Sequence, residues 1–544
     1  MGFKEAYARS PLGKYREVIR LAPREVIYNG SLILSAILYA MSAVPMSWDQ
    51  GSSAVVPSLP GFQNHFHITS GANASQIRNF VSLVFIGMAA GAASSFLLND
   101  LIGRLWSFRL YQTVWIIGQI VAIFATNLPT LWAARIISGL GIGALSVTGP
   151  MSIVEIAPAE IRGLLTSWFV VAMATGLFVS IFCVYGLFLH HAANRLQYQI
   201  VWFAPCIFIA LWIIASFYLC ESPRWLMMVG RRADAIKTLT RLRGLPEDHP
   251  RVQAELSDIE QSINSLTNGE KKTYLANLTS VVKETFTSSS NVRRVIQTVI
   301  SYGLAQLSGA NAVTSYLMPI LEIIGVAKGN TSEKMFISGM YGMAKFFIAI
   351  IASFFFIDAL GRRRSLFIGV ITQMISDIYI GVFIKYKQDG NPSNAASTAA
   401  IAAIFIHAFG YYVGLCMLPY IFGGEVWPNR IRSFGGALSQ TFHWAFSYGL
   451  TFGMPSILSD MNNWGAFLFF AGWCFTALCY VYLMVPELSG LSVEEVDNVF
   501  KGPWLNARRS TKHVIDGVDD VDRENFGKVT NNGAVEDTKI PVPV

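Results

Sequence analysis

Long apolar segments recur along this chain and constrain its fold more than any other feature. Windows of 18 or more residues that are almost free of charge follow one another through the sequence. A helix of this length crosses a hydrocarbon layer roughly 30 Å thick. Because 53% of the residues are hydrophobic and only 14% are charged, a soluble fold with one buried core does not account for so many windows. The sequence therefore predicts an all-α membrane protein.

Twelve membrane spans can be placed. They cover residues 30–50, 79–99, 106–126, 128–150, 164–187 and 199–220, and then 294–318, 334–357, 365–386, 398–424, 434–457 and 464–485. An even number of spans puts both ends of the chain on one side of the membrane. The residues before the first span include six basic ones, whereas the first loop after it carries only Arg78. The positive-inside rule therefore predicts cytoplasmic termini. We expect the plasma membrane, because no address for an internal membrane is evident.

A set of charged landmarks occurs twice, in the same order, on either side of a long polar interval. The first set is Asp100 with Arg104, Glu155 with Arg162, and Glu221 with Arg224; the second is Asp358 with Arg362, Glu425 with Arg432, and Glu487. Corresponding acids lie 258 to 270 residues apart, so the sequence predicts a duplicated unit. Because each landmark follows a span on the cytoplasmic side, we expect paired charges that join helices in one state and separate in another.

This duplication divides the chain into five parts. We expect a cytoplasmic N-terminal tail at 1–29, a six-helix half at 30–220, a cytoplasmic linker at 221–293, a second six-helix half at 294–487 and a cytoplasmic tail at 488–544. Apolar residues at helical spacing between 231 and 268 predict short amphipathic helices in the linker. The polar composition after residue 500 predicts disorder in the C-terminal tail.

Two opposite charges stand out in the first half. Asp49 lies at the end of the first span, and Arg135 lies in the fourth span before a run of glycines that would let helices approach closely. A buried carboxylate opposed by an arginine can carry a proton. The alternatives are a helix boundary in water for Asp49 and a side chain extended to the interface for Arg135.

Lys345 lies midway through the eighth span and is the most unusual residue of the second half. An ammonium at membrane depth costs several kcal/mol unless it is paired or hydrated. It therefore serves either as a counter-charge for an anionic substrate or as a structural partner of an acid such as Asp377 in the ninth span.

The seventh span contains two amides in a segment rich in glycine. Gln306 and Asn311 point about 140° apart on a regular helix, so both face one cavity only if the helix breaks near Gly303 or Gly309. The tenth span has similar breakers. For the two histidines of the second half, His407 and His443, we favour satisfied core positions over ligands.

Several function classes are excluded by the motifs that the sequence lacks. No nucleophile–base pair, Gly-rich phosphate loop, Walker motif or metal-ligand spacing is found, so we expect no enzyme, no cofactor and no metal site. The basic residues lie in the gaps between spans, where they act as topology signals and do not indicate nucleic-acid binding. The sequons at Asn73 and Asn330 fall in loops outside the membrane and are candidates for glycosylation.

Taken together, these motifs resemble the sugar porter family of the major facilitator superfamily. The matching pieces are Asp100-x-x-Gly-Arg104, Arg135 with its glycine run, Glu155-x-x-Pro-x-x-x-Arg162, Glu221-Ser-Pro-Arg224, Gln306-x-Ser-Gly-x-Asn311, Asp358-x-x-Gly-Arg362, Glu425-x-x-Pro and Pro486-Glu487. The resemblance implies two six-helix halves, alternating access and a polyhydroxylated substrate bound at the midplane. In proton-coupled members the acid of the first helix works with the arginine of the fourth, and Asp49 and Arg135 occupy those places.

Departures from that family's pattern bear on the substrate. Amides that bind sugar in typical members are replaced by Val170, Ala305 and Phe346, and a tryptophan of the tenth helix is Tyr420, while Trp444 is retained. Because each buried sugar hydroxyl needs a hydrogen-bond partner, these changes weaken a typical hexose site.

Lys345, together with the segment 23–29, resembles the fungal quinate-permease branch of the family. The resemblance implies a cyclic polyol carboxylate as substrate, with Lys345 at the carboxylate and Gln306 and Asn311 at hydroxyl groups. The residues around Asp49 depart from the family's usual glycine-tyrosine-aspartate pattern.

The sequence thus predicts a secondary transporter that carries a sugar or sugar-like polyol together with protons, with an acidic cyclitol such as quinate favoured. The expected substrate-binding residues are Gln306, Asn311, Lys345, Tyr420 and Trp444. An uncoupled hexose facilitator, a carrier of a secondary metabolite and a nutrient sensor that does not transport are the alternatives. We expect the protein to act as a monomer in the lipid bilayer.

Overall fold

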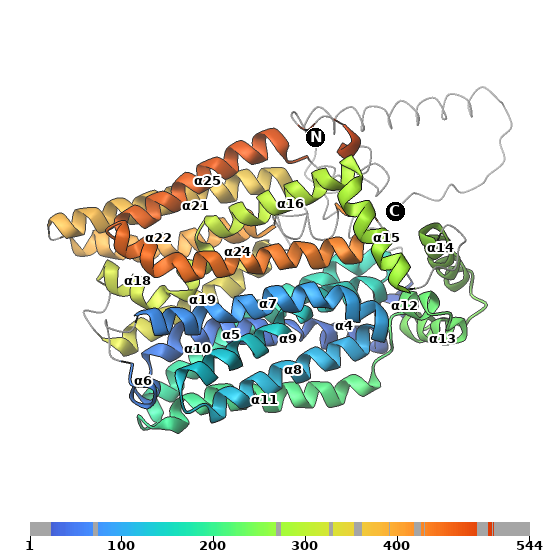
Figure 1. The fold of residues 1–544 in the computed structure, drawn as a ribbon, viewed down its shortest axis with the longest axis horizontal. Helices are drawn as coiled ribbons and strands as arrows, with labels where there is room; N and C mark the ends of the chain where they lie inside the picture. The colour runs from blue at the N-terminus through green and yellow to red at the C-terminus, as the bar shows by residue number, and fades with distance from the viewer. Residues whose placement is uncertain are drawn as a thin grey trace.

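The computed structural model describes residues 23–68, 74–267, 274–325, 330–352, 362–390, 392–417, 426–428, 430–486, 499–502 and 504. Within these ranges the regular elements are helices, and most of them run nearly parallel or antiparallel along the long axis of the molecule (Figure 1). The predicted all-α membrane architecture is confirmed. The C-terminal tail from residue 505 onward lies outside the described residues.

The helices of the first half follow the predicted spans closely. They are α3 (Arg24–Ile27), α4 (Gly30–Ala40), α5 (Ala43–Val55), α6 (Pro60–Phe66), α7 (Ala74–Ile102), α8 (Arg104–Phe124), α9 (Leu128–Ile156), α10 (Arg162–His190) and α11 (Arg195–Ala215). The first span is formed by α4 and α5 together. The predicted end of the fourth span at residue 150 was too early, because α9 continues through Pro150 for six more residues.

The linker and the second half complete the bundle. The linker helices are α12 (Pro223–Met228), α13 (Arg232–Arg243), α14 (Pro250–Thr267) and α15 (Tyr274–Thr287). The helices that follow are α16 (Ser289–Leu307), α17 (Ala310–Ser315), α18 (Leu317–Ile324), α19 (Thr331–Ile351), α21 (Arg362–Asp389), α22 (Asn394–Val413), α24 (Arg432–Asp460) and α25 (Trp464–Met484).

Among the described residues, ten helices are long and apolar enough to cross a membrane. An eleventh span is formed by α16–α17 with α18, which is bent by 81°. The remaining predicted span is α24, whose length suffices but which carries several polar residues along its course. These elements match the twelve predicted spans.

Polar side chains begin several of these helices. The Oδ1 atom of Asn29 accepts hydrogen bonds from the N–H groups of Ser31 and Leu32 and starts α4. The Oδ1 atom of Asn127 accepts from the N–H group of Thr130 and starts α9. Short side chains that accept such bonds satisfy N–H groups that have no partner within the helix. Polar residues at the span ends therefore help to fix where each helix begins.

The linker helices form a small unit at one end of the bundle (Figure 1). Leu239 on α13 and Leu256 on α14 are buried together with Val26 of α3. The guanidinium of Arg251 on α14 also binds Glu160, two residues before α10 begins, at 2.6 Å. The linker is therefore attached to the membrane-spanning helices by both apolar and ionic contacts.

Helices α7 and α9 pack backbone against backbone through glycines. A Cβ atom added at Gly143 would lie 1.9 Å from the carbonyl oxygen of Met88, and one at Gly139 would lie 2.2 Å from that of Val84. Interfaces between membrane helices depend on such small residues, because lipid offers no hydrophobic drive for association.

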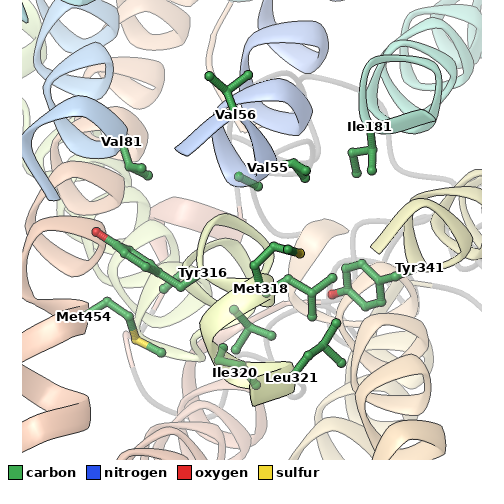
Figure 2. Packing of buried hydrophobic residues seen from close by; sticks show 14 of the residues in the cluster. Val55, Val56, Val81, Ile181, Tyr316, Met318, Ile320, Leu321, Tyr341 and Met454 are labelled. Atoms are coloured by element: carbon green, nitrogen blue, oxygen red, sulfur yellow. The ribbon is translucent and has the colours of Figure 1, made fainter. Parts of the chain in front are cut away.

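The two halves meet along two helix pairs and through an apolar cluster. Helix α7 packs against α24, and α10 packs against α19. At the end opposite the linker, Val55 and Ile181 of the first half face Met318 and Leu321 of the second (Figure 2). Because these side chains are almost completely buried, the bundle is closed at that end.

The close approach of α7 and α9 predicts that a single methyl group destabilises the protein. Gly143→Ala is expected to lower the free energy of unfolding by about 1–3 kcal/mol, because the new Cβ forces the helices apart. Gly186→Ala is the matched control, because nothing lies within 4 Å of its added Cβ. Thermal unfolding of both purified variants in detergent measures the difference; equal melting temperatures would contradict the packing argument.

Candidate functional site

Asp49 on α5 and Arg135 on α9 form a buried ion pair. The side chains are 2% and 3% exposed, and Nη1 of Arg135 donates to Oδ1 of Asp49. The other guanidinium nitrogens donate to the hydroxyl of Ser53 at 2.7 Å and to the carbonyl oxygen of Phe80 at 2.9 Å. Asp49 is therefore not a helix boundary in water, and Arg135 does not reach an interface; the two alternatives considered from the sequence are wrong.

One oxygen of this carboxylate is left without a hydrogen bond. Among the described residues, Oδ2 of Asp49 has no partner. The guanidinium above the Phe80 ring, 4.7 Å from its centroid, fixes the position of the charge. A carboxylate with one oxygen on arginine and one oxygen free is able to accept a proton at the free oxygen.

The seventh span breaks where the sequence placed its glycines. Helix α16 ends at Leu307, and Gly309 has a φ of 85°, which favours glycine. Helix α17 begins at once, and the side-chain amide of Asn311 donates to Oε1 of Gln306 at 2.9 Å. The prediction that a break brings these two amides together is confirmed.

His443 on α24 extends this polar chain toward the first half. Its Nδ1 atom lies 3.1 Å from Nε2 of Gln306, and its ring lies 4.5 Å from that of Trp444. The indole N–H of Trp444 donates in turn to the hydroxyl of Ser146 on α9, at 3.1 Å. His443, which the sequence analysis favoured as a core residue, therefore contacts the candidate site. In the sequence, only its position directly before Trp444 indicated that it lies near the site.

Lys345 on α19 lies next to this chain of polar groups and is 4% exposed. Its Nζ atom donates to Oγ1 of Thr314, one helical turn beyond Asn311 on α17. The same atom lies 4.8 Å from the ring centroid of Tyr341 and 5.9 Å from that of Tyr412. No carboxylate that the structure describes forms an ion pair with it. Oδ1 of Asp377 lies instead 3.4 Å from Nε2 of His407.

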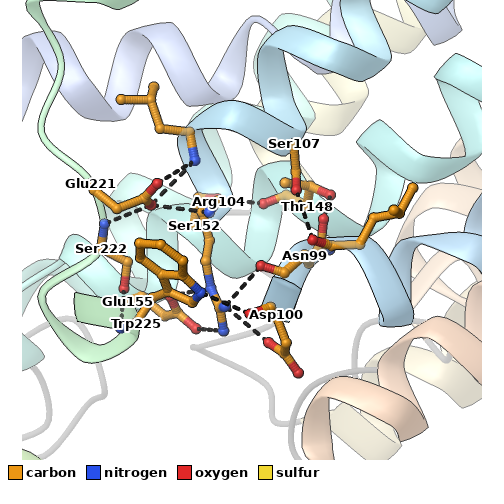
Figure 3. Close-up of polar contacts among 12 residues, drawn as sticks. Asn99, Asp100, Arg104, Ser107, Thr148, Ser152, Glu155, Glu221, Ser222 and Trp225 are labelled. Carbon is orange, nitrogen blue, oxygen red and sulfur yellow. Dashed lines mark hydrogen bonds and ion pairs between the residues drawn. The ribbon is translucent and has the colours of Figure 1, made fainter. Parts of the chain in front are cut away.

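At the linker end, Arg104 joins the ends of three helices (Figure 3). Its guanidinium donates to both carboxylate oxygens of Glu155 on α9 at 2.9 Å and to Asp100 on α7 at 2.9 Å. In this structure Glu155 therefore binds Arg104 and not Arg162, and its pairing with Arg162 stays a prediction. The repeat marked the right charges, but which charges meet depends on how α8 and α9 are rotated.

Glu221 binds the beginning of α8 through main-chain groups. Its carboxylate accepts from the N–H groups of Arg104 at 3.0 Å and Leu105 at 3.1 Å (Figure 3). A Cβ at Gly103 would lie 2.5 Å from Glu221, so the site needs glycine there. Burial raises the pKa of the Glu221 carboxyl above its usual range, while the N–H bonds and the charge of Arg104 oppose that shift. Anionic groups bind favourably at helix N-termini.

The other expected residues divide into described and undescribed ones. Arg224 donates to the hydroxyl of Ser262 at 3.3 Å, and Arg432 lies 3.4 Å from the carbonyl oxygen of Trp427. Asn330 is exposed, and its side chain begins α19 by accepting from Ser332. Four other expected residues lie outside the described residues: Asp358, Tyr420, Glu425 and Asn73. The side chain of Arg362 is also outside them. Their roles, and glycosylation at Asn73 and Asn330, stay predictions.

These elements define a class: a multi-pass membrane protein with a broken helix and buried polar groups between two helical halves. The chain belongs to the sugar (and other) transporter family, whose model matches residues 35–500. This assignment confirms the predicted family and the prediction of a transporter rather than an enzyme. Relatives include a probable quinate permease of Aspergillus niger, 28% identical over 492 residues, which cover 89% of this chain and 90% of the relative. A quinate permease of Emericella nidulans is 27% identical over 528 residues, 95% of this chain and 97% of the relative.

Solved structures show the same fold. A proton:xylose symporter of the major facilitator superfamily, XylE, bound to 6-bromo-6-deoxy-D-glucose, matches with a TM-score of 0.72 at 19% identity. The match covers 87% of this chain and 100% of that one. An inward open conformation of XylE from E. coli matches with a TM-score of 0.67 over 86% of this chain and 99% of that one. The predicted major facilitator fold is confirmed.

Arg104 is expected to be a strong determinant of stability. Arg104→Gln leaves the carboxylates of Asp100 and Glu155 without their counter-charge and is expected to cost about 3–5 kcal/mol. Arg231→Gln is the matched control, because Arg231 and its partner Asp234 are 59% and 50% exposed, and such pairs contribute about 0–1 kcal/mol. Chemical unfolding of the two variants compares them; a loss for Arg104→Gln no larger than that of the control would contradict the role of the buried cluster.

Proposed function

We propose that this protein imports an acidic cyclitol, with quinate as the favoured substrate, together with protons by alternating access. The observation that carries the proposal is Lys345, a buried cation without a carboxylate partner among the described residues, beside the broken seventh span. The relatives named as quinate permeases support the same substrate class.

The surroundings of Lys345 suit an anion that arrives and leaves. A buried ammonium costs several kcal/mol unless an opposite charge or water compensates it. Thr314 supplies one hydrogen bond, and the faces of Tyr341 and Tyr412 stabilise positive charge. A carboxylate from the substrate would complete the site, and the ammonium has two further N–H groups with which to bind it.

The polar groups next to Lys345 suit the hydroxyl groups of such a ring. Asn311 and Gln306 lie on either side of the break and bring their amides together, and His443 and Trp444 continue the series toward α9. In the proposal these side chains exchange their mutual hydrogen bonds for bonds to substrate. Tyr420 is proposed to join them.

Apolar replacements near this site support a substrate other than a typical hexose. Phe346 packs against Phe178 across the interface of α19 and α10, with ring centroids 5.3 Å apart. Ala305 is completely buried on α16. Neither side chain offers a hydrogen bond to a hydroxyl, so a substrate that binds through its carboxylate fits the site better than one that needs a full set of amides.

Proton coupling is assigned to Asp49 and Arg135. When Asp49 takes up a proton from outside, its attraction to Arg135 weakens, and α5 is freed to move relative to α9. Substrate binds, the halves at 30–220 and 294–487 rock, and the charges around Arg104 separate to open the linker side. Substrate and proton then leave to the cytoplasm, where both termini lie. We assign the protein to the plasma membrane, as a monomer.

Lys345 is expected to decide which substrates are carried. Lys345→Gln is expected to lower quinate uptake by about tenfold to a hundredfold, because a hydrogen bond to a charged group contributes about 1.5–3 kcal/mol. Lys283→Gln, in an exposed position on α15, is the matched control. Uptake of labelled quinate and labelled glucose into cells without their own carriers measures the effect. Glucose uptake indifferent to Lys345, without quinate uptake, would overturn the proposed substrate.

Asp49 is expected to control how quinate accumulation depends on the pH of the outer medium. In wild type, quinate accumulation should rise as the outer medium is made acidic, because protons bind Asp49 from outside. Asp49→Asn cannot exchange that proton and is expected to lose the share of the acid stimulation and of the accumulation that this proton supplies. Asp460→Asn, an exposed acid at the end of α24, is the control. Full-rate uptake that stays acid-stimulated in Asp49→Asn would contradict the assignment.

A further inference from the structure

A second buried carboxylate lies in the second half, away from the Asp49–Arg135 pair. Asp377 on α21 is completely buried, and His407 on α22 is 1% exposed. The Nε2 atom of His407 lies 3.4 Å from Oδ1 of Asp377. Among the described residues, Oδ1 and Oδ2 of Asp377 and Nδ1 of His407 have no hydrogen-bond partner. A carboxylate and an imidazole are thus held next to each other in an apolar environment, and both have atoms that can still form hydrogen bonds.

The groups around this pair carry little charge. From α19, Lys345 acts electrostatically on His407, and Tyr341 interacts electrostatically with Asp377. From α25, Cys474 interacts electrostatically with Asp377. Next to α22, Cys416 interacts in the same way with Lys345. Among the described residues that act on His407, Lys345 is the basic one, and it does not form an ion pair with Asp377.

Gln373 determines which nitrogen of His407 carries a hydrogen when the imidazole is neutral. Its side-chain Nε2 donates to the carbonyl oxygen of Ser308 at 3.0 Å and lies 3.1 Å from Nε2 of His407. An amide nitrogen can only donate, so Nε2 of His407 is an acceptor when the ring is neutral. Oδ1 of Asp377 also lies 3.4 Å from Nε2 and has no hydrogen-bond partner among the described residues. A deprotonated carboxylate would place a second acceptor beside Nε2, and one proton bound to the pair removes this repulsion.

The same glutamine connects the pair to the substrate site. Ser308 is the residue between the end of α16 and Gly309, where the seventh span breaks. Gln306 and Asn311 lie on either side of this break. A change in the proton at His407 alters the bond to Gln373, and through it the position of the Ser308 carbonyl. The pair is thus linked to the hinge that carries the amides.

We propose that Asp377 and His407 form a second proton-binding site of the transport cycle, connected through Gln373 to the break between α16 and α17. A proton from outside binds between the carboxylate and the imidazole, travels with the substrate as the halves rock, and leaves to the cytoplasm. No bond other than that to the proton forms or breaks.

The charge that a second proton would move across the membrane depends on the proposed anionic substrate. One proton carried with one monovalent carboxylate is electroneutral, and a membrane potential then does not drive uptake. Two protons, one at Asp49 and one at the Asp377–His407 pair, move one net positive charge inward with each substrate. For one net charge, each 59 mV of inside-negative potential raises the accumulation ratio about tenfold.

Purified full-length protein in proteoliposomes tests the stoichiometry. A potassium diffusion potential set with valinomycin, without a pH gradient, is combined with labelled quinate. Wild type is expected to show the tenfold change per 59 mV, whereas Asp377→Asn is expected to lose it and to retain accumulation driven by a pH gradient. Asp389→Asn, an exposed acid at the end of the same helix, should behave as wild type. Accumulation in wild type that ignores the potential, or a potential dependence unchanged in Asp377→Asn, overturns the proposal.

A second measurement does not depend on the substrate. Infrared difference spectra of the purified protein across a pH step report the carbonyl band of each buried carboxylic acid. We expect Asp377→Asn to remove a band that Asp49→Asn leaves in place, and His407→Gln to shift that same band. If the band appears but quinate is not carried, the proposed substrate fails and the proton site stands. If Asp377→Asn removes no band, the proton site fails whatever the substrate.

Discussion

Charge inside a hydrocarbon layer is costly, and the polar architecture of this protein follows from that constraint. Asp49 is buried with Arg135, and Arg104 is buried with Asp100 and Glu155. Each cluster joins different helices, so the ionic contacts that lower the cost of burial also decide which helices stay together. A transporter has to release such contacts in turn, and pairs between helices can separate when the helices move.

The broken seventh span is the second element on which the arrangement depends. A continuous helix would point Gln306 and Asn311 in different directions, whereas the left-handed turn at Gly309 brings their side chains within 2.9 Å. The break also exposes the carbonyl oxygen of Ser308 to Gln373. Backbone groups freed from a helix need partners in a membrane, so polar side chains gather at the break, and the candidate substrate site lies among them.

The contacts between the two halves have different chemistry at different depths. At the end opposite the linker they are apolar, with Val55 and Ile181 against Met318 and Leu321. Midway, the indole of Trp444 on α24 reaches Ser146 on α9. Apolar contacts separate without leaving unpaired charges, which suits a surface that opens and closes. Polar contacts at the middle exchange partners when a substrate with several hydroxyl groups arrives.

The sequence by itself predicted the spans, the duplication, the linker helices and, as one of the interpretations it left open, the burial of Asp49 with Arg135. These follow from hydrophobic length, from spacing along one chain and from the cost of isolated charge, which do not require knowledge of neighbouring helices. The tertiary structure alone decided which side chains meet. Glu155 binds Arg104, Asp377 lies beside His407 and not beside Lys345, and His443 contacts Gln306. Such pairings depend on the rotation of each helix about its axis, and packing against neighbours sets that rotation.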